Sequence, residues 1–129
     1  MDTIANFIVK LKNAGDARHE SVVAPFSNLK VAIAEVLKKE GFVKNVEERM
    51  EKGKKVIVVT LIQDEQRIPK IKGIQRISKP SKRIYKKTSE IRAIKNGYGS
   101  LVLSTSQGVM SGRDAKKQKL GGEALFSIW

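Results

Sequence analysis

The four consecutive β-branched aliphatic residues from Val56 to Val59 constrain the fold of this chain more than any other segment. Such a run is typical of a central, buried strand, where nearly every side chain meets apolar neighbours. We therefore expect one strand over residues 55–62 and another over residues 42–46, joined by a turn at Glu51–Lys54. Residues 22–25 are expected to form a short edge strand, because Pro25 has no amide hydrogen to donate to a ladder.

Two amphipathic helices are predicted in the same half. The first has Asp2 or Thr3 as its cap and Gly15 as its stop, and its apolar side chains fall at i, i+3, i+4 and i+7: Ile4, Phe7, Ile8 and Leu11. The second begins after the cap Ser27 and ends at Gly41, and its predicted buried face consists of Leu29, Ile33, Val36 and Leu37.

The second half contains shorter, strand-rich segments. Ile71, Ile74 and Ile77 favour a twisted or bulged strand. Further strands are expected from Ile84, over residues 101–104, and at the end of the chain, where Ala124, Phe126 and Ile128 alternate. Turns or loops are predicted at residues 79–82, 96–99 and 121–122, and a short helix over residues 111–118 begins with a capping-box pattern, Ser111 and Asp114.

These elements predict an α+β protein of two small lobes. The N-terminal lobe, residues 1–69, has the order α-β-α-β-β. The C-terminal lobe, residues 70–129, is mostly β with one short helix.

Charge is unevenly divided between these lobes. Residues 1–69 carry 12 Lys/Arg and 10 Asp/Glu, a net of 12 − 10 = +2, whereas residues 70–129 carry 14 and 3, a net of 14 − 3 = +11. Such asymmetry indicates a polyanionic partner for the second half. Nucleic acid is favoured, and an anionic membrane surface is the alternative; no apolar run is long enough for a transmembrane helix.

The sequence offers no candidate active site. It has no cysteine and one histidine, His19, in a polar loop, so neither a metal nor another cofactor is expected. Glu47, Glu48 and Glu51 crowd one hairpin end and are interpreted as solvated surface. Gly97-Tyr98-Gly99 lacks the strand-loop-helix context of a phosphate-binding loop. We therefore predict a binding protein and not an enzyme.

The strongest candidate for phosphate contact is the stretch of residues 70–87, which has eight cations and no acid: Lys70, Lys72, Arg76, Lys79, Lys82, Arg83, Lys86 and Lys87. Phosphates would neutralise their mutual repulsion. Tyr85, inside this stretch, is either a base-stacking residue or a core residue of a short strand.

Two weaker candidates lie in the first half. Lys30 stands in the first turn of the second predicted helix, where a cation opposes the helix dipole unless a phosphate binds beside Ser27. Lys10 and Asn13 share the polar face of the first helix and could contact a nucleic-acid backbone. A lysine that extends into water is the favoured explanation of the first pattern, and a solvated helix face is the default explanation of the second.

Three consecutive hydroxyl side chains, Ser104, Thr105 and Ser106, stand at a predicted strand end. Small hydroxyls suit a shallow RNA minor groove, where 2′-hydroxyls and base edges are exposed. Gly108 permits a turn, and Gly121-Gly122 permits close backbone approach. A polar turn explains either feature alone, but the local charge favours a groove-reading surface.

Several motifs together resemble a known family. Ser104-Thr105-Ser106-x-Gly108-Val109-Met110, Arg113-x-Ala115-Lys116 and Gly121-Gly122-Glu123 resemble the S-eight family of small-subunit ribosomal proteins, of bacterial or organellar type. The resemblance continues upstream and covers essentially the whole chain, through Ile74-x-Arg76-Ile77-Ser78-Lys79-Pro80, Arg83-x-Tyr85, Lys12-Asn13-Ala14 and Pro25-x-Ser27-x-Leu29-Lys30. The chain departs from the family pattern at Ser81, Ile91-Arg92, Ser111-Gly112 and Gly97-Tyr98-Gly99-Ser100, where the family usually has Gly-Leu-Gly-Ile.

The resemblance implies a structural constituent of the small subunit that binds the central domain of 16S-type rRNA early and helps assemble the platform. It implies groove contact by Ser104–Ser106, RNA contact by Tyr85, support of the loop by Gly122 and Glu123, and secondary contacts by Asn13, Ser27 and Lys30. Ribosomal proteins five and twelve are implied neighbours. The expected location is the cytoplasmic ribosome or an organellar stroma or matrix. The alternative is a stand-alone regulatory RNA-binding protein, such as a repressor of its own mRNA.

Overall fold

A computed structural model describes residues 3–66, 68 and 70–129 of the chain. The chain divides into two compact units, residues 3–72 and residues 73–129. Asp2, the alternative cap of the first helix, and Pro69, beside the expected lobe boundary, lie outside the described residues. The division gives two separate α+β bodies, each with its own sheet.

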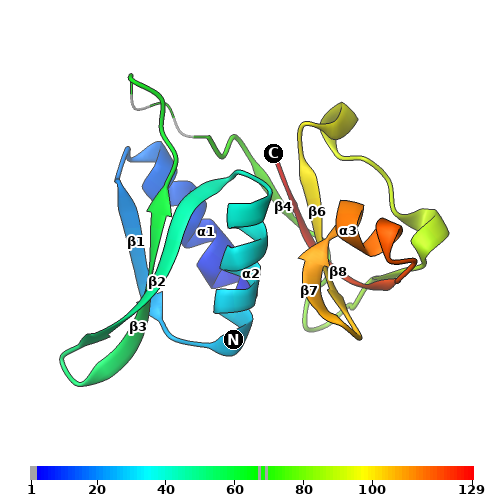
Figure 1. The fold of residues 1–129 in the computed structure, drawn as a ribbon, viewed down its shortest axis with the longest axis horizontal. Coiled ribbons are helices and arrows are strands. Elements are labelled where there is room, and N and C mark those ends of the chain that lie inside the picture. Colours follow the sequence, from blue (N-terminus) through cyan, green and yellow to red (C-terminus); the bar gives the residue numbers. More distant parts are fainter. Residues whose placement is uncertain (1–2, 67, 69) are drawn as a thin grey trace. The chain divides into compact units, whose positions relative to one another are not determined.

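The first unit is a three-stranded antiparallel sheet with two helices. Its elements, labelled in Figure 1, are α1 (Thr3–Asp16), β1 (Ser21–Pro25), α2 (Asn28–Lys39), β2 (Val43–Glu51) and β3 (Lys54–Leu61). The strand order is β1-β3-β2. The β-branched run therefore occupies the central strand and β1 is an edge strand, as predicted.

Helix α1 buries the predicted apolar stripe, Ile4, Phe7, Ile8 and Leu11. The prediction for α2 is only partly correct, because its buried residues are Ile33, Ala34 and Leu37, while Leu29 is 36% exposed. At 100° per residue, Leu29 points about 80° away from Leu37, so it lies at the side of the stripe and Ala34 lies within it. Ser27 caps α2, and Gly41 follows with a φ of 84°.

Strand β2 is longer than the predicted strand over residues 42–46. It continues to Glu51 because its charged half pairs with the start of β3, where Lys55 forms an ion pair with Glu48 at 3.1 Å. The acidic residues at this hairpin end are exposed or half-buried, which agrees with a solvated surface.

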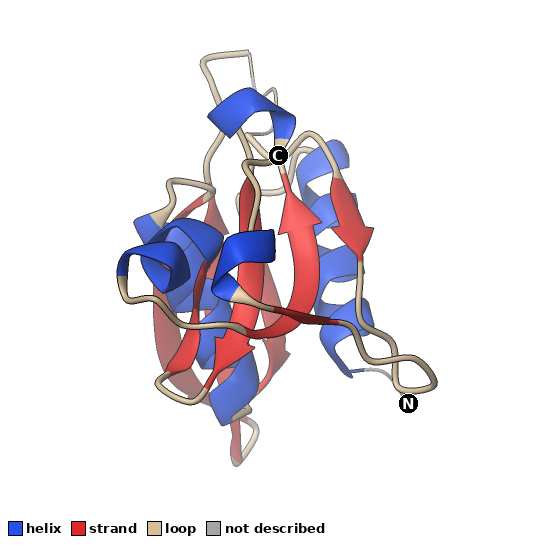
Figure 2. Ribbon diagram, turned by 90° about the vertical axis from the view of Figure 1, so that its right-hand side faces the viewer, coloured by secondary structure: helices blue, strands red, loops and turns tan. Residues whose placement is uncertain are grey.

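The second unit is a five-stranded antiparallel sheet with one short helix, and its strands run side by side in Figure 2. The elements are β4 (Ile74–Arg76), β5 (Tyr85–Lys86), β6 (Ser100–Thr105), β7 (Gly108–Ser111), α3 (Gly112–Lys117) and β8 (Gly122–Ile128), with 3-10 turns η1 (Thr88–Glu90) and η2 (Lys95–Gly97). The order is β4-β8-β6-β7, and β5 pairs with β8 beyond the end of β4.

Three predictions for this unit are wrong in detail. Strand β7 was not expected, because four residues beginning with glycine carry little strand signal. Gly122 is the first residue of β8 and not part of a turn. Residues 124–128 are all buried instead of alternating. Part of the reason is a bulge: Val102 pairs with Phe126 but Leu103 pairs with Ala124, so Leu125 is an extra residue in β8.

One core cluster of the second unit packs β6, β7, β8 and α3 together. It comprises Ile91, Leu101, Leu103, Met110, Ala115 and Ala124. Ser111 caps α3, since its Oγ accepts from the amide of Asp114 at 3.1 Å, as the capping-box pattern predicted. Among the described residues, no helix is both long and apolar enough to cross a membrane.

Candidate nucleic-acid interface

Three candidate residues from distant parts of the sequence stand in one row of the second sheet. Tyr85 of β5 pairs with Glu123 of β8, and Glu123 pairs in turn with Ser104 of β6. Side chains of directly paired residues project from the same face with Cβ atoms about 4.5–5.5 Å apart. The row therefore joins an aromatic ring, a carboxylate and a small hydroxyl on one surface.

Tyr85 is 67% exposed, so the alternative interpretation of this residue as a core tyrosine is wrong. Its neighbour Glu123 has a side chain only 15% exposed, and its carboxylate accepts from Arg83 Nη1 at 3.1 Å. The ion pair directs the guanidinium toward the row while half of the Arg83 side chain stays exposed. A planar guanidinium beside an exposed ring suits stacking on a base or contact with phosphate.

The hydroxyls at the end of β6 differ in what they already bind. Thr105 Oγ1 donates to the carbonyl of Gly108 at 2.8 Å and accepts from the amide of Gln107 at 3.1 Å, so it closes the β6–β7 hairpin. The hydroxyls of Ser104 and Ser106 have no hydrogen-bond partner within the part of the chain that the structure describes. Ser104 and Ser106 can therefore bind an external group, whereas Thr105 mainly shapes the turn.

Gly122 is needed for the backbone beneath this hairpin. A Cβ on Gly122 would lie 2.3 Å from the carbonyl oxygen of Ser104 and 3.1 Å from Thr105 Cγ2. Gly121 is similarly close to the Lys86 carbonyl, at 2.5 Å. The carbonyl oxygens of Ser104 and Lys86 belong to the backbone and cannot rotate away from a new side chain. The two glycines therefore permit β5, β8 and β6 to approach one another and form the row.

The basic residues of this unit do not all join the row. Lys79 and Lys82 face each other across a tight, exposed turn, with mutual backbone hydrogen bonds of 2.9 and 3.0 Å. Arg76 is half-buried on β4 opposite Phe126, three positions along β8 from Glu123. The structure thus brings Arg83 to the row, while the two lysines stand on a separate turn.

Ser78, which the sequence did not single out for a role, holds the basic turn in place. It is fully buried, and its hydroxyl accepts from the amide of Ile84 at 2.8 Å and donates to the Ile84 carbonyl at 3.1 Å. These bonds fix both ends of the segment that carries Lys79, Lys82 and Arg83. A serine just before a Lys-Pro turn was the available signal, because serine hydroxyls often close turns on the backbone.

In the first unit, two lysines cover the free edge of β1. Lys10 Nζ donates to the carbonyl of Val23 at 2.6 Å, and Lys30 Nζ donates to the carbonyl of Pro25 at 3.1 Å. These carbonyls are two residues apart, as expected for groups on one edge of a strand. The Lys30 amide also donates to Ser27 Oγ at 3.0 Å. Both ammonium groups therefore already have a protein acceptor.

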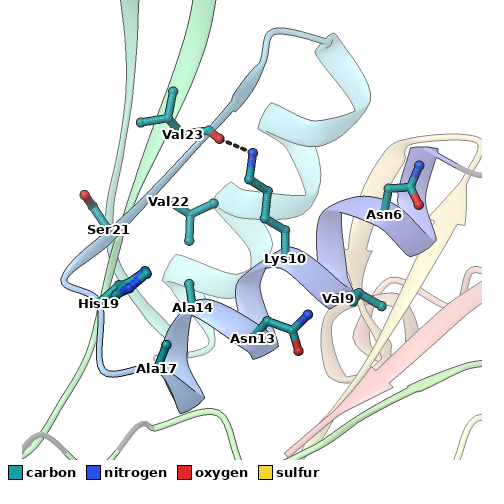
Figure 3. A pocket seen from close by; sticks show the side chains of 10 residues that line it. All are labelled: Asn6, Val9, Lys10, Asn13, Ala14, Ala17, His19, Ser21, Val22 and Val23. Carbon is teal, nitrogen blue, oxygen red and sulfur yellow. Dashed lines mark hydrogen bonds between the residues drawn. The ribbon is translucent and has the colours of Figure 1, made fainter.

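Asn13 lies one helical turn after Lys10, beside an open hollow of about 620 Å³ between α1 and β1. Figure 3 shows Asn13 and Lys10 on α1 facing this hollow, with Val22 and Val23 on its other side. Asn13 is exposed and could reach an RNA backbone, but Ser27 and Lys30 do not line the hollow. The structure gathers Lys10 and Asn13 together and places Ser27 with Lys30 at the start of α2.

The described residues provide no cluster of three or more His, Asp or Glu side chains that could hold a metal ion. His19 is exposed in its loop, in agreement with its interpretation as a solvated residue.

The more cationic of the two α+β units carries the Tyr85–Glu123–Ser104 row, with the Arg83 guanidinium held beside it by Glu123. Such a surface suits the binding of a polyanion. The family model for "Ribosomal protein S8" matches residues 2–129. The chain is 44% identical over 128 residues to the small ribosomal subunit protein uS8 of Anaeromyxobacter sp. (strain Fw109-5), covering 99% of this chain and 97% of the relative. It is 40% identical over 129 residues to the uS8 protein of Bdellovibrio bacteriovorus, with both chains covered completely. The chain belongs to the ribosomal protein S8 family.

Proposed function

We propose that this chain is a structural constituent of the small ribosomal subunit that binds the central domain of 16S-type rRNA directly and early in platform assembly. The observation that carries the proposal is the row Tyr85–Glu123–Ser104, which joins three short segments of a cationic unit on one exposed surface. The family relatives are themselves small-subunit proteins.

In this proposal the β6–β7 hairpin enters a minor groove, where the hydroxyls of Ser104 and Ser106 bind 2′-hydroxyls or base edges. Tyr85 and Arg83 stack on or bond to the adjacent strand, and Lys79 and Lys82 neutralise phosphates nearby. Asn13, Ser27 and Lys30 of the first unit provide secondary contacts. Residues 70–129 are thus the main rRNA-binding part and residues 1–69 the secondary one, and ribosomal proteins five and twelve are proposed neighbours.

The test is filter binding of the intact protein to a central-domain rRNA transcript at several salt concentrations, beside an unrelated transcript of equal length. We expect log K to fall linearly with log salt, by roughly 0.9 for each neutralised phosphate, and the central-domain transcript to bind more tightly throughout. Equal affinity for the two transcripts would contradict the proposal. High-salt co-sedimentation with small subunits separates a subunit component from a stand-alone repressor, which would remain in the supernatant and bind its own mRNA.

A further inference from the structure

Tyr98 is 86% exposed, more than any other large hydrophobic side chain among the described residues. An aromatic ring that stays in water adds little to the free energy of folding, because it buries no apolar surface. An exposed ring of this size therefore suggests a contact with an external partner. Tyr98 lies just before β6, whereas Ser104 and Ser106 lie at the far end of the same strand. At about 3.3 Å per residue, β6 separates the two surfaces by roughly 15–20 Å.

The segment that carries Tyr98 is a closed, hydrogen-bonded loop. The amides of Gly97 and Gly99 both donate to the carbonyl of Ile94 at 3.0 Å, and the Tyr98 amide donates to the Lys95 carbonyl at 3.1 Å. Lys95 and Gly97 have φ angles of 49° and 94°, in the left-handed region. A lysine in that conformation is held there by its surroundings, so the loop is a defined platform for the ring.

The base of this loop is packed tightly against the C-terminus. A Cβ on Gly99 would lie 2.6 Å from the Ile128 carbonyl oxygen and 3.0 Å from Trp129 Cβ. Lys95 Nζ lies 4.6 Å from the centre of the Trp129 ring, within cation–π range. These contacts hold the loop on the second unit, and Figure 1 shows it leading directly into β6.

The charge around Tyr98 is positive. Residues 91–99 contain Arg92 and Lys95, both exposed, and no acid. The preceding acid, Glu90, is engaged locally, because its carboxylate accepts from the amide of Lys87 at 2.8 Å. An exposed ring flanked by two cations fits a nucleic-acid strand better than an apolar protein surface, which would offer neither cation a negative charge.

We propose that Tyr98 stacks on an unpaired RNA base while Arg92 and Lys95 contact the adjoining phosphates, forming a second RNA contact at the opposite end of β6 from the Ser104–Ser106 hairpin. This inference rests on the proposed rRNA-binding function and extends it to a different surface. A single-stranded base is the chemical target, because an aromatic face stacks on any base that has left its duplex.

The test uses the full-length protein and the central-domain transcript. We expect Tyr98→Ala to weaken binding about tenfold with an unchanged salt slope, Tyr98→Leu to behave similarly, and Tyr98→Phe to bind within about twofold of the wild type, because phenylalanine keeps the stacking face. Arg92→Gln should lower the slope by roughly 0.7, the contribution of one single-strand phosphate. The matched control is Met50→Ala, which truncates a side chain that is 67% exposed in the first unit and should leave affinity unchanged.

Base-specific chemical probing of the transcript gives a second readout. The wild type and Tyr98→Phe should protect one unpaired nucleotide that becomes reactive with Tyr98→Ala. If Tyr98→Ala binds like the wild type and gives the same probing pattern, the second contact does not exist. If RNA binding is unchanged but the variant is depleted from reconstituted small subunits, Tyr98 contacts a protein and the inference is overturned. Failure of the wild type itself to bind the transcript would instead defeat the proposed function.

Discussion

The two candidate RNA-binding regions differ in whether their polar groups are already used within the protein. At the β6–β7 hairpin, the hydroxyls of Ser104 and Ser106 have no partner among the described residues. At the edge of β1, the ammonium groups of Lys10 and Lys30 bind the carbonyls of Val23 and Pro25. The Ser104 and Ser106 hydroxyls can therefore bind RNA with their full hydrogen-bonding capacity, whereas Lys10 and Lys30 each already use one ammonium donor on a backbone carbonyl.

This difference also suggests different roles: the hairpin for recognition of RNA, and the two lysines for protection of a strand edge. The hairpin presents small groups on a surface fixed by three paired strands, which suits groove reading. The two lysines cover an exposed strand edge, which natural proteins commonly protect with lysine or proline against pairing with another chain. Both regions were predicted to contact RNA, and the four experiments below test whether they differ as the structure indicates.

The largest effect is expected from the charges of the basic turn. The double variant Lys79→Gln, Lys82→Gln should lower the salt slope by about 1.8 and weaken rRNA binding roughly 50-fold near 0.1 M salt, because two phosphates lose their cations. The matched variant Lys10→Gln, Lys30→Gln removes the same charge and should weaken binding less than about threefold. Filter binding across a salt series measures both, and a larger loss with the second pair would reverse the assignment of the two regions.

The next effect concerns the backbone under the hairpin. Gly122→Ala should destabilise the fold by about 2 kcal/mol and weaken binding roughly 30-fold, because the new methyl group meets the Ser104 carbonyl oxygen at 2.3 Å. The control is Gly112→Ala, whose nearest neighbours are side-chain carbons of Ile91 and Leu101 at 3.1 and 3.2 Å. It should cost less than about 1 kcal/mol, since these side chains can shift and alanine favours the helix. Urea melts measure the stability and binding titrations the affinity. Wild-type stability and affinity in Gly122→Ala would disprove the close-approach argument.

A smaller effect distinguishes the three hydroxyls. Ser104→Ala and Ser106→Ala should each weaken binding about tenfold, because the RNA group that binds the hydroxyl loses its hydrogen-bond partner. Each should change the free energy of unfolding by less than about 0.5 kcal/mol. Thr105→Val should instead destabilise the free protein by about 1 kcal/mol, because its hydroxyl closes the turn on Gly108 and Gln107. The salt slope should stay constant in all three. A stability loss in the serine variants equal to that of Thr105→Val would assign all three hydroxyls to the turn.

The smallest effect is expected at the edge of β1. Lys10→Met with Lys30→Met keeps the apolar stems but frees the carbonyls of Val23 and Pro25. The free energy of unfolding should fall by less than about 1 kcal/mol, whereas self-association should increase, because an uncovered edge can pair with a second copy. Sedimentation at rising protein concentration measures the association, with Lys52→Met as the control on an exposed turn. A strictly monomeric double variant would show that the lysines do not protect the edge.

Elements with local signals could be predicted from the amino-acid sequence alone. The stripe of α1, the caps Ser27 and Ser111, and the central position of Val56–Val59 each follow from spacing or from a hydroxyl beside a helix start, and the structure has all of them. Net charge and sequence motifs likewise indicated the cationic half and the family.

Which candidate residues lie together, and which already have a hydrogen-bond partner, depends on long-range folding. Tyr85, Glu123 and Ser104 are distant in sequence, and they share a row because β8 pairs with β5 on one edge and β6 on the other. The use of Lys10 and Lys30 as covers of β1, and of Ser78 as the tie of the basic turn, likewise depends on carbonyls and amides whose position no local pattern specifies. Strand register and hydrogen-bond partners are set by long-range pairing, so they are fixed only in the folded chain.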